Sequence, residues 1–86
     1  MPTNPNEGIH SRAHIALNTQ SDLMLFMLAA SKYEDVFVVE DERSTRRVNA
    51  SSMLGMAYAT SEFGNLYLVN ESRDGVIPSD FDRFRI

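Results

Sequence analysis

The chain contains no cysteine, only two histidines and no apolar run long enough to cross a bilayer. Without cysteine, neither a disulfide framework nor a thiolate metal site can form, so packing alone must hold the fold together. The longest apolar stretch, residues 23–30, is far shorter than the ~20 residues that a membrane span needs. It also lacks the position and basic flank of a signal sequence. We therefore expect a cytoplasmic protein with no membrane partner.

Basic charge is scarce as well. Eight lysines and arginines stand against twelve acidic residues, which leaves a net charge of −4. This balance argues against nucleic acid as a partner. The one basic cluster, Arg43, Arg46 and Arg47, follows the acidic residues 40–42 directly. We interpret these charges as a solvated part of a hairpin.

The residues that catalysis requires do not occur in a recognisable pattern. No nucleophile stands with a matching base and acid, and no glycine-rich phosphate loop is present. His10 and His14 have no carboxylate pair near them in the sequence, which makes a poor metal site. His14 is expected on the exposed side of a strand. The prediction is a protein that is not an enzyme and uses no cofactor and no metal.

The 86 residues are enough for one small domain, and 43% of them are hydrophobic, an ordinary composition for a globular protein. Residues 1–11 are polar and rich in turn-forming types, which predicts a disordered leader. Residues 12–86 are left as the domain.

Hydrophobic periodicity and breakers divide that domain into six main elements. They are a strand from residue 12, a helix over 21–33, strands over 35–40 and 46–50, a helix from 51 or 52 to 63, and a strand over 66–69. The order β-α-β-β-α-β predicts an α+β, open-faced β-sandwich: a four-stranded antiparallel sheet with helices on one face. The loop between the second and third strands lacks a two-residue turn signal, so it is expected to be longer and looser.

Several local features refine this prediction. Ser21 is the expected N-cap of the first helix, which is apolar around most of its circumference and should be covered on more than one side. Gly64 stands where the second helix should end in a left-handed residue. Beyond Pro78, Ser79 could cap a turn or two of helix that places Phe81 and Phe84 on one side. Those aromatic rings either plug the core or leave an apolar surface for a partner subunit.

One block of sequence resembles a known family. The block resembles a sequence pattern of the HPr phosphocarrier family of the bacterial sugar phosphotransferase system (PTS). The residues that match this pattern in type and spacing are Val48, Asn49, Ser52, Met53 and Gly55. The similarity in order and spacing extends over roughly residues 12–72, two-thirds of the chain, and it implies the HPr-like open-faced sandwich. The long C-terminal helix of the family is shortened or missing.

The resemblance also implies what has been lost. In the family the first helix opens with a phosphoryl-accepting histidine, followed closely by arginine and proline. Here the histidine position falls on Thr19, or on Gln20 if the loop is shortened, while Ser21 and Asp22 replace the arginine and proline. No imidazole is available, and the carboxylate would repel a phosphoryl group. This degenerate member is similar to the catabolite-repression HPr-like proteins that keep a regulatory serine and lack the histidine.

Two features of the second helix are implied by the resemblance. Ser52 matches the serine that HPr kinase phosphorylates, although a plain N-cap shared with Ser51 explains it equally well. Met53, Leu54 and Ala57 match the exposed apolar face that docks PTS components, the kinase or transcription regulators. The alternative is that these side chains are partly buried, whereas Met56 and Ala59 should point inward.

The leading hypothesis is therefore a non-catalytic HPr-like regulatory or interaction protein, related to carbohydrate uptake and switched at Ser52. One alternative is a phosphocarrier of the phosphoenolpyruvate-dependent system with an unorthodox acceptor such as His14. Another is a structural module that forms a homodimer through the surface uncovered by the short C-terminus.

Overall fold

The computed structural model describes residues 12–34, 36–72 and 75–86. The leader expected over residues 1–11, with its His10, lies outside the described residues. The elements follow one another in the predicted order: β1 (Arg12–Ile15), α2 (Gln20–Ser31), β2 (Phe37–Glu40), β3 (Arg47–Asn49), α3 (Met53–Glu62), β4 (Leu66–Asn70) and the 3₁₀ helix η1 (Ser79–Phe84).

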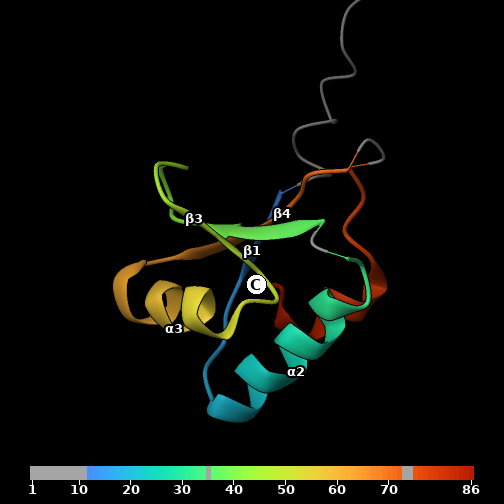
Figure 1. Cartoon of the computed structure of the whole chain (residues 1–86), viewed down its shortest axis with the longest axis horizontal. Coiled ribbons are helices and arrows are strands. Elements are labelled where there is room, and N and C mark those ends of the chain that lie inside the picture. The colour runs from blue at the N-terminus through green and yellow to red at the C-terminus, as the bar shows by residue number, and fades with distance from the viewer. Residues whose placement is uncertain (1–11, 35, 73–74) are drawn as a thin grey trace, which may run out of the picture.

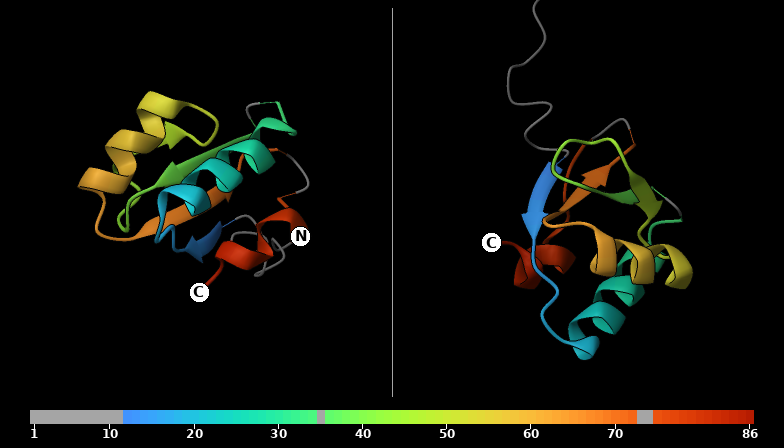
Figure 2. Two further views of the ribbon diagram at one scale, coloured as in Figure 1. Left: turned by 90° about the horizontal axis from the view of Figure 1, so that it is seen from below. Right: turned by 90° about the vertical axis from the view of Figure 1, so that its left-hand side faces the viewer.

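The strands form one antiparallel sheet in the order β1-β4-β2-β3. The hairpin β2–β3 pairs Val39 with Val48, and β4 lies between β2 and β1, where Leu68 pairs with both Val39 and Ala13. The helices α2, α3 and η1 all lie on one side of this sheet (Figure 1), and the left view of Figure 2 shows α2 between α3 and η1. The α+β class and the four-stranded antiparallel sheet are thus confirmed.

Strand β1 carries the predicted alternation but is shorter than expected. Ala13 and Ile15 are buried, and the ring of His14 stacks on that of Tyr67 with centroids 4.7 Å apart. His14 is half-buried and not exposed, because the neighbouring strand supplies an aromatic partner directly opposite it. The edge of β1 away from β4 pairs with the end of the chain: Ile15 bridges to Arg85, the Ala16 N–H donates to the carbonyl of Phe84 at 2.8 Å, and the Ile86 N–H donates to the carbonyl of His14 at 3.0 Å.

Helix α2 begins earlier than predicted. Its N-cap is Thr19, whose extended backbone lets the hydroxyl accept from the Asp22 N–H at 3.0 Å. Ser21 was expected as the cap and is instead inside the first turn, because Thr19 offers the same hydroxyl two residues earlier. The helix buries Phe26, Ala29 and Ala30, as its inner face.

The outer face of α2 is open, against the expectation of cover on more than one side. The exposed fractions of Met24, Leu25 and Leu28 are 46%, 40% and 60%. Segment η1 packs against one flank of the helix, and nothing among the described residues covers the outer stripe.

The C-terminal segment fills the core. Phe81 and Phe84 are buried, and their rings lie 5.6 and 5.5 Å from that of Phe26. The aromatic rings thus fill the core, as the first alternative expected, while the outer stripe of α2 stays exposed, as the second expected. Ser79 makes no capping bond: the N-cap is Pro78, and the helix is a tight 3₁₀ turn.

Gly64 does not have the left-handed conformation that its position suggested. Among the described glycines only Gly75 has a positive φ, of 60°. Helix α3 ends instead at Phe63, an extended residue whose N–H donates to the carbonyl of Ala59. Because Phe63 turns its ring into the core, burial and not a glycine turn determines where the chain leaves the helix.

Candidate functional site

Ser52 is the N-cap of α3. Its extended backbone directs the hydroxyl oxygen toward the first turn, where it accepts from the Gly55 N–H at 3.0 Å. The Ser51 hydroxyl donates to the side-chain oxygen of Asn49 at 2.7 Å. The residue in the N-cap position is therefore Ser52, and Ser51 precedes it.

Gly55 allows the first turn of α3 to lie against strand β3. A Cβ built at this position would lie 3.0 Å from the Cβ of Val48 and 3.2 Å from the Ser52 hydroxyl oxygen. Side chains rarely come that close, so the absence of one here has a steric reason. The spacing of valine, serine and glycine noted in the sequence is thus one packed unit in three dimensions.

The start of α3 presents apolar side chains to solvent. Met53 is 65% exposed and Leu54 is 86% exposed, and Ala57 is exposed beside them. Met56 and Ala59 are fully buried, as predicted. The alternative that Met53 and Leu54 are partly buried is wrong, while their role in docking stays a prediction.

Tyr58 extends this surface and was not identified from the sequence. Its side chain is 46% exposed, its ring meets that of Phe63 edge-on at 5.7 Å, and its hydroxyl accepts from Arg46 at 3.4 Å. The only available signal was its helical spacing from Leu54, which a single sequence cannot separate from an ordinary surface residue. We call Met53, Leu54, Ala57 and Tyr58 the α3 face.

The N-terminus of α2 carries the four residues of the degenerate acceptor region: Thr19, Gln20, Ser21 and Asp22. Thr19 bonds the Asp22 N–H, and in return the Asp22 carboxylate accepts from the Asn18 N–H at 3.1 Å. An anion bound at a helix N-terminus would use the amides of the first turn. Of these, the Asp22 N–H already donates to the Thr19 hydroxyl, and the Asp22 carboxylate adds negative charge to the first turn.

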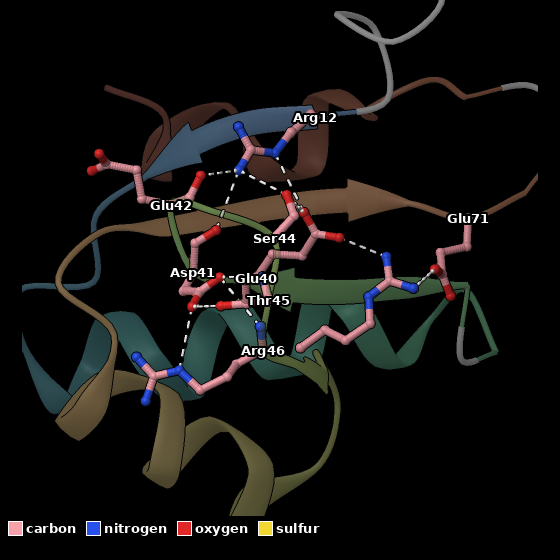
Figure 3. Close-up of polar contacts among 9 residues, drawn as sticks. Arg12, Glu40, Asp41, Glu42, Ser44, Thr45, Arg46 and Glu71 are labelled. Atoms are coloured by element: carbon pink, nitrogen blue, oxygen red, sulfur yellow. Dashed lines mark hydrogen bonds and ion pairs between the residues drawn. The ribbon is translucent and has the colours of Figure 1, made fainter.

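Arg43, Arg46 and Arg47 near the β2–β3 hairpin are exposed, as expected from the sequence, whereas Glu40 and Asp41 before them are buried. Glu40 is only 6% exposed. Its carboxylate accepts hydrogen bonds from the side chains of Ser44 at 2.8 Å, Arg47 at 2.6 Å and Arg12 at 3.4 Å (Figure 3). Burial alone would raise the pKa of the Glu40 carboxyl, but these three donors outweigh it and lower the pKa. Arg47 also forms an ion pair with Glu71.

Asp41 organises the loop that follows. Its carboxylate accepts from the hydroxyl and the N–H of Thr45, at 2.7 and 2.8 Å, and from the side chain of Arg46 at 3.3 Å. The Thr45 hydroxyl contributes most to lowering the pKa of Asp41, against the opposing effect of desolvation. Ser44 adopts a φ of 60° to close the turn. The expected long loop is present, but hydrogen bonds hold it in one shape.

Glu40 and Asp41 are paired with Arg12, Arg46 and Arg47, and these ion pairs explain the shape of the hairpin. In the part of the chain that the structure describes, no three acidic or histidine side chains gather as a metal site. Within the same residues no helix has the length and apolar character that crossing a bilayer requires.

Comparison with known proteins identifies no relative of the chain. No protein-family model, no curated protein and no solved structure matches the chain. The resemblance to the HPr family therefore remains a prediction from the sequence.

Proposed function

We propose that this protein is a non-catalytic, HPr-like regulatory or interaction protein that binds protein partners through the α3 face and is switched by phosphorylation of Ser52. The observation that carries the proposal is the exposure of Leu54, at 86%, next to Met53 at 65%. Two adjacent large apolar side chains in water are stabilised when a partner covers them, and methionine adapts its shape to different surfaces.

The setting of Ser52 supports a switch at this position. Helix α3 has no acidic residue in its first turn, so the positive end of its dipole has no side-chain anion. A phosphate on the Ser52 oxygen would accept from the first-turn amides and add negative charge directly beside the α3 face. One modification would then change both the charge and the accessibility of the docking surface.

The setting of α2 supports the absence of phosphocarrier activity. The Thr19 hydroxyl already accepts from the Asp22 N–H in the first turn, and the Asp22 carboxylate there would repel an incoming phosphoryl group by charge. His14, the unorthodox acceptor considered above, stacks on Tyr67 in the middle of a sheet strand and not at a helix N-terminus. These observations favour the interaction protein over the phosphocarrier.

The test is the intact mass of the protein after incubation with a bacterial HPr kinase and ATP. The proposal expects one added phosphate on the wild type and on the control Ser51→Ala, and none on Ser52→Ala. No phosphate on any of the three would refute the switch. Incubation with phosphoenolpyruvate and enzyme I should leave the mass unchanged, and an acid-labile adduct there would restore the phosphocarrier alternative.

Docking is tested separately by titrating the wild type and Leu54→Glu against purified PTS proteins, including the kinase. Binding that Leu54→Glu weakens at least tenfold, while the matched variant Leu28→Glu on α2 does not, supports the α3 face. Equal loss in both variants, or binding that neither affects, would exclude it.

A further inference from the structure

The outer face of α2 is a second exposed apolar surface, apart from the α3 face. Met24, Leu25 and Leu28 lie on it in the i, i+1, i+4 pattern of a helix stripe, with exposed fractions of 40% to 60%. Beside the stripe, an open groove of about 600 Å³ runs between α2 and η1. Its α2 wall includes Leu25, Leu28, Ala29 and Lys32, and Phe84 and Arg83 form part of the η1 wall.

We propose that this surface binds a second copy of the same chain, with the two α2 helices antiparallel about a twofold axis. The first reason is shape. Leu25, Leu28, Ala29 and Lys32 are spaced as i, i+3, i+4 and i+7, which is the outline of the hole that receives one side chain from a facing helix. Ala29 is small and forms the floor of that hole.

The same helix supplies the side chain that fills the hole. When the twofold axis passes between Leu25 and Leu28, helical geometry places each copy's Met24 opposite the partner's Ala29. Leu25 then faces Leu28 across the axis, twice. Met24 is unbranched and 46% exposed, so it can extend into the groove without rearranging the core.

The second reason is charge. Asp22 lies in the first turn of α2 and Lys32 is its C-cap, so the two ends of the exposed stripe carry opposite charges. The antiparallel arrangement brings each Asp22 near the partner's Lys32, and a parallel arrangement would not. Lys32 pairs with Asp80 at 3.4 Å, yet its side chain is 66% exposed and its ammonium group has donors to spare. The surface is therefore complementary to itself in both shape and charge.

An interface formed by a single helix face and one side of η1 is smaller than the ~800 Å² that each partner buries in a standard complex. We therefore expect a weak dimer in reversible equilibrium with the monomer. The first test is sedimentation equilibrium of the whole chain, from about 10 µM to 1 mM. The proposal expects a monomer–dimer equilibrium in which Leu28→Glu raises the dissociation constant at least tenfold. The matched control Leu54→Glu, also an exposed leucine on a helix, should leave it unchanged.

The second test separates the antiparallel arrangement from other contacts. Asp22→Lys and Lys32→Asp should each associate about tenfold more weakly than the wild type, because both interhelical pairs become like-charged. An equimolar mixture of the two variants should recover, since every mixed dimer contains two opposite pairs. Far-UV circular dichroism verifies that each variant is folded.

Three results would overturn the proposal: a wild type that stays monomeric at 1 mM, a dimer that Leu28→Glu leaves intact, or a mixture that does not recover. Failure here leaves the proposed function untouched, since that rests on α3 and on Ser52. Conversely, loss of phosphorylation at Ser52 would say nothing about the α2 dimer.

Discussion

Replacing Phe81 tests whether the short C-terminal segment is part of the core. The Phe81 side chain is fully buried, and its ring lies 4.9 Å from that of Phe37, 5.6 Å from Phe26 and 6.1 Å from Tyr33. A buried phenylalanine changed to alanine costs about 3–5 kcal/mol, and each close aromatic pair adds about 0.5–1.5 kcal/mol beyond the buried area. With three such neighbours we expect Phe81→Ala to lose about 4–5 kcal/mol.

A loss of that size is large for a domain of this length. Small proteins have about 0.05–0.15 kcal/mol of stability per residue, which gives roughly 4–13 kcal/mol for a chain of 86 residues. Phe81→Ala therefore removes between a third and all of the stability. Phe81→Leu keeps most of the apolar volume and should lose only about 1–2 kcal/mol, so it stays measurable if the alanine variant unfolds.

The assay is urea denaturation followed by far-UV circular dichroism. For Phe81→Leu the unfolding midpoint should fall by about 1 M, given the m-values typical of small domains. The control is Ile86→Ala, because Ile86 is 75% exposed and its bond to the His14 carbonyl comes from the backbone N–H. That control should change the free energy of unfolding by less than about 0.5 kcal/mol. A loss below about 1 kcal/mol in Phe81→Ala would refute the placement of η1 in the core.

Four further predictions use the same denaturation assay. Ser52→Ala removes the cap of α3 and should cost about 0.5–2 kcal/mol, whereas Ser52→Asp, which also caps, should be nearly neutral; equal losses would contradict the capping geometry. Gly55→Ala forces a Cβ to within 3.0 Å of Val48 and should cost about 1–3 kcal/mol before a helix-propensity gain of up to about 1 kcal/mol. At Gly64 the space is open and φ is not positive, so Gly64→Ala should be neutral or slightly stabilising, and destabilisation there would contradict the loop conformation. Because the folded-state pKa of Asp41 is lowered, its contribution to stability is full above the unfolded pKa near 4 and is lost as the pH falls through the folded value. Asp41→Asn should therefore be less stable than the wild type at neutral pH, with the gap closing in acid; a constant gap would contradict the hydrogen bonds to Asp41.

Much of the architecture follows from the sequence itself. Alternation of apolar residues located the strands, and breakers such as Pro78 and the serines before α3 located the helix boundaries to within a few residues. The order of the elements along the chain was enough to predict an antiparallel sheet with helices on one face, because such short connections allow few other topologies. The inward direction of Met56 and Ala59 and the outward direction of Leu54 follow from helical period.

Other features were decided only in three dimensions. Ser21 and Thr19 are both good caps, and the backbone conformation at Thr19 selects it. The burial of Glu40 depends on Arg12, which is 28 residues away in the chain and reaches it across the sheet. Gly64 was read as a left-handed stop, yet the burial of Phe63 determines the end of α3.

The difference has one physical reason. Local patterns report which residues can form an element and which face of it is apolar, since both depend on neighbours in the sequence. Whether that face is covered depends on what else reaches it. Phe81 and Phe84 cover the inner side of α2 from the far end of the chain, while nothing among the described residues covers Met24, Leu25 and Leu28. The sequence thus determined the elements and their apolar faces, and only the tertiary structure decided which of those faces stay free to bind.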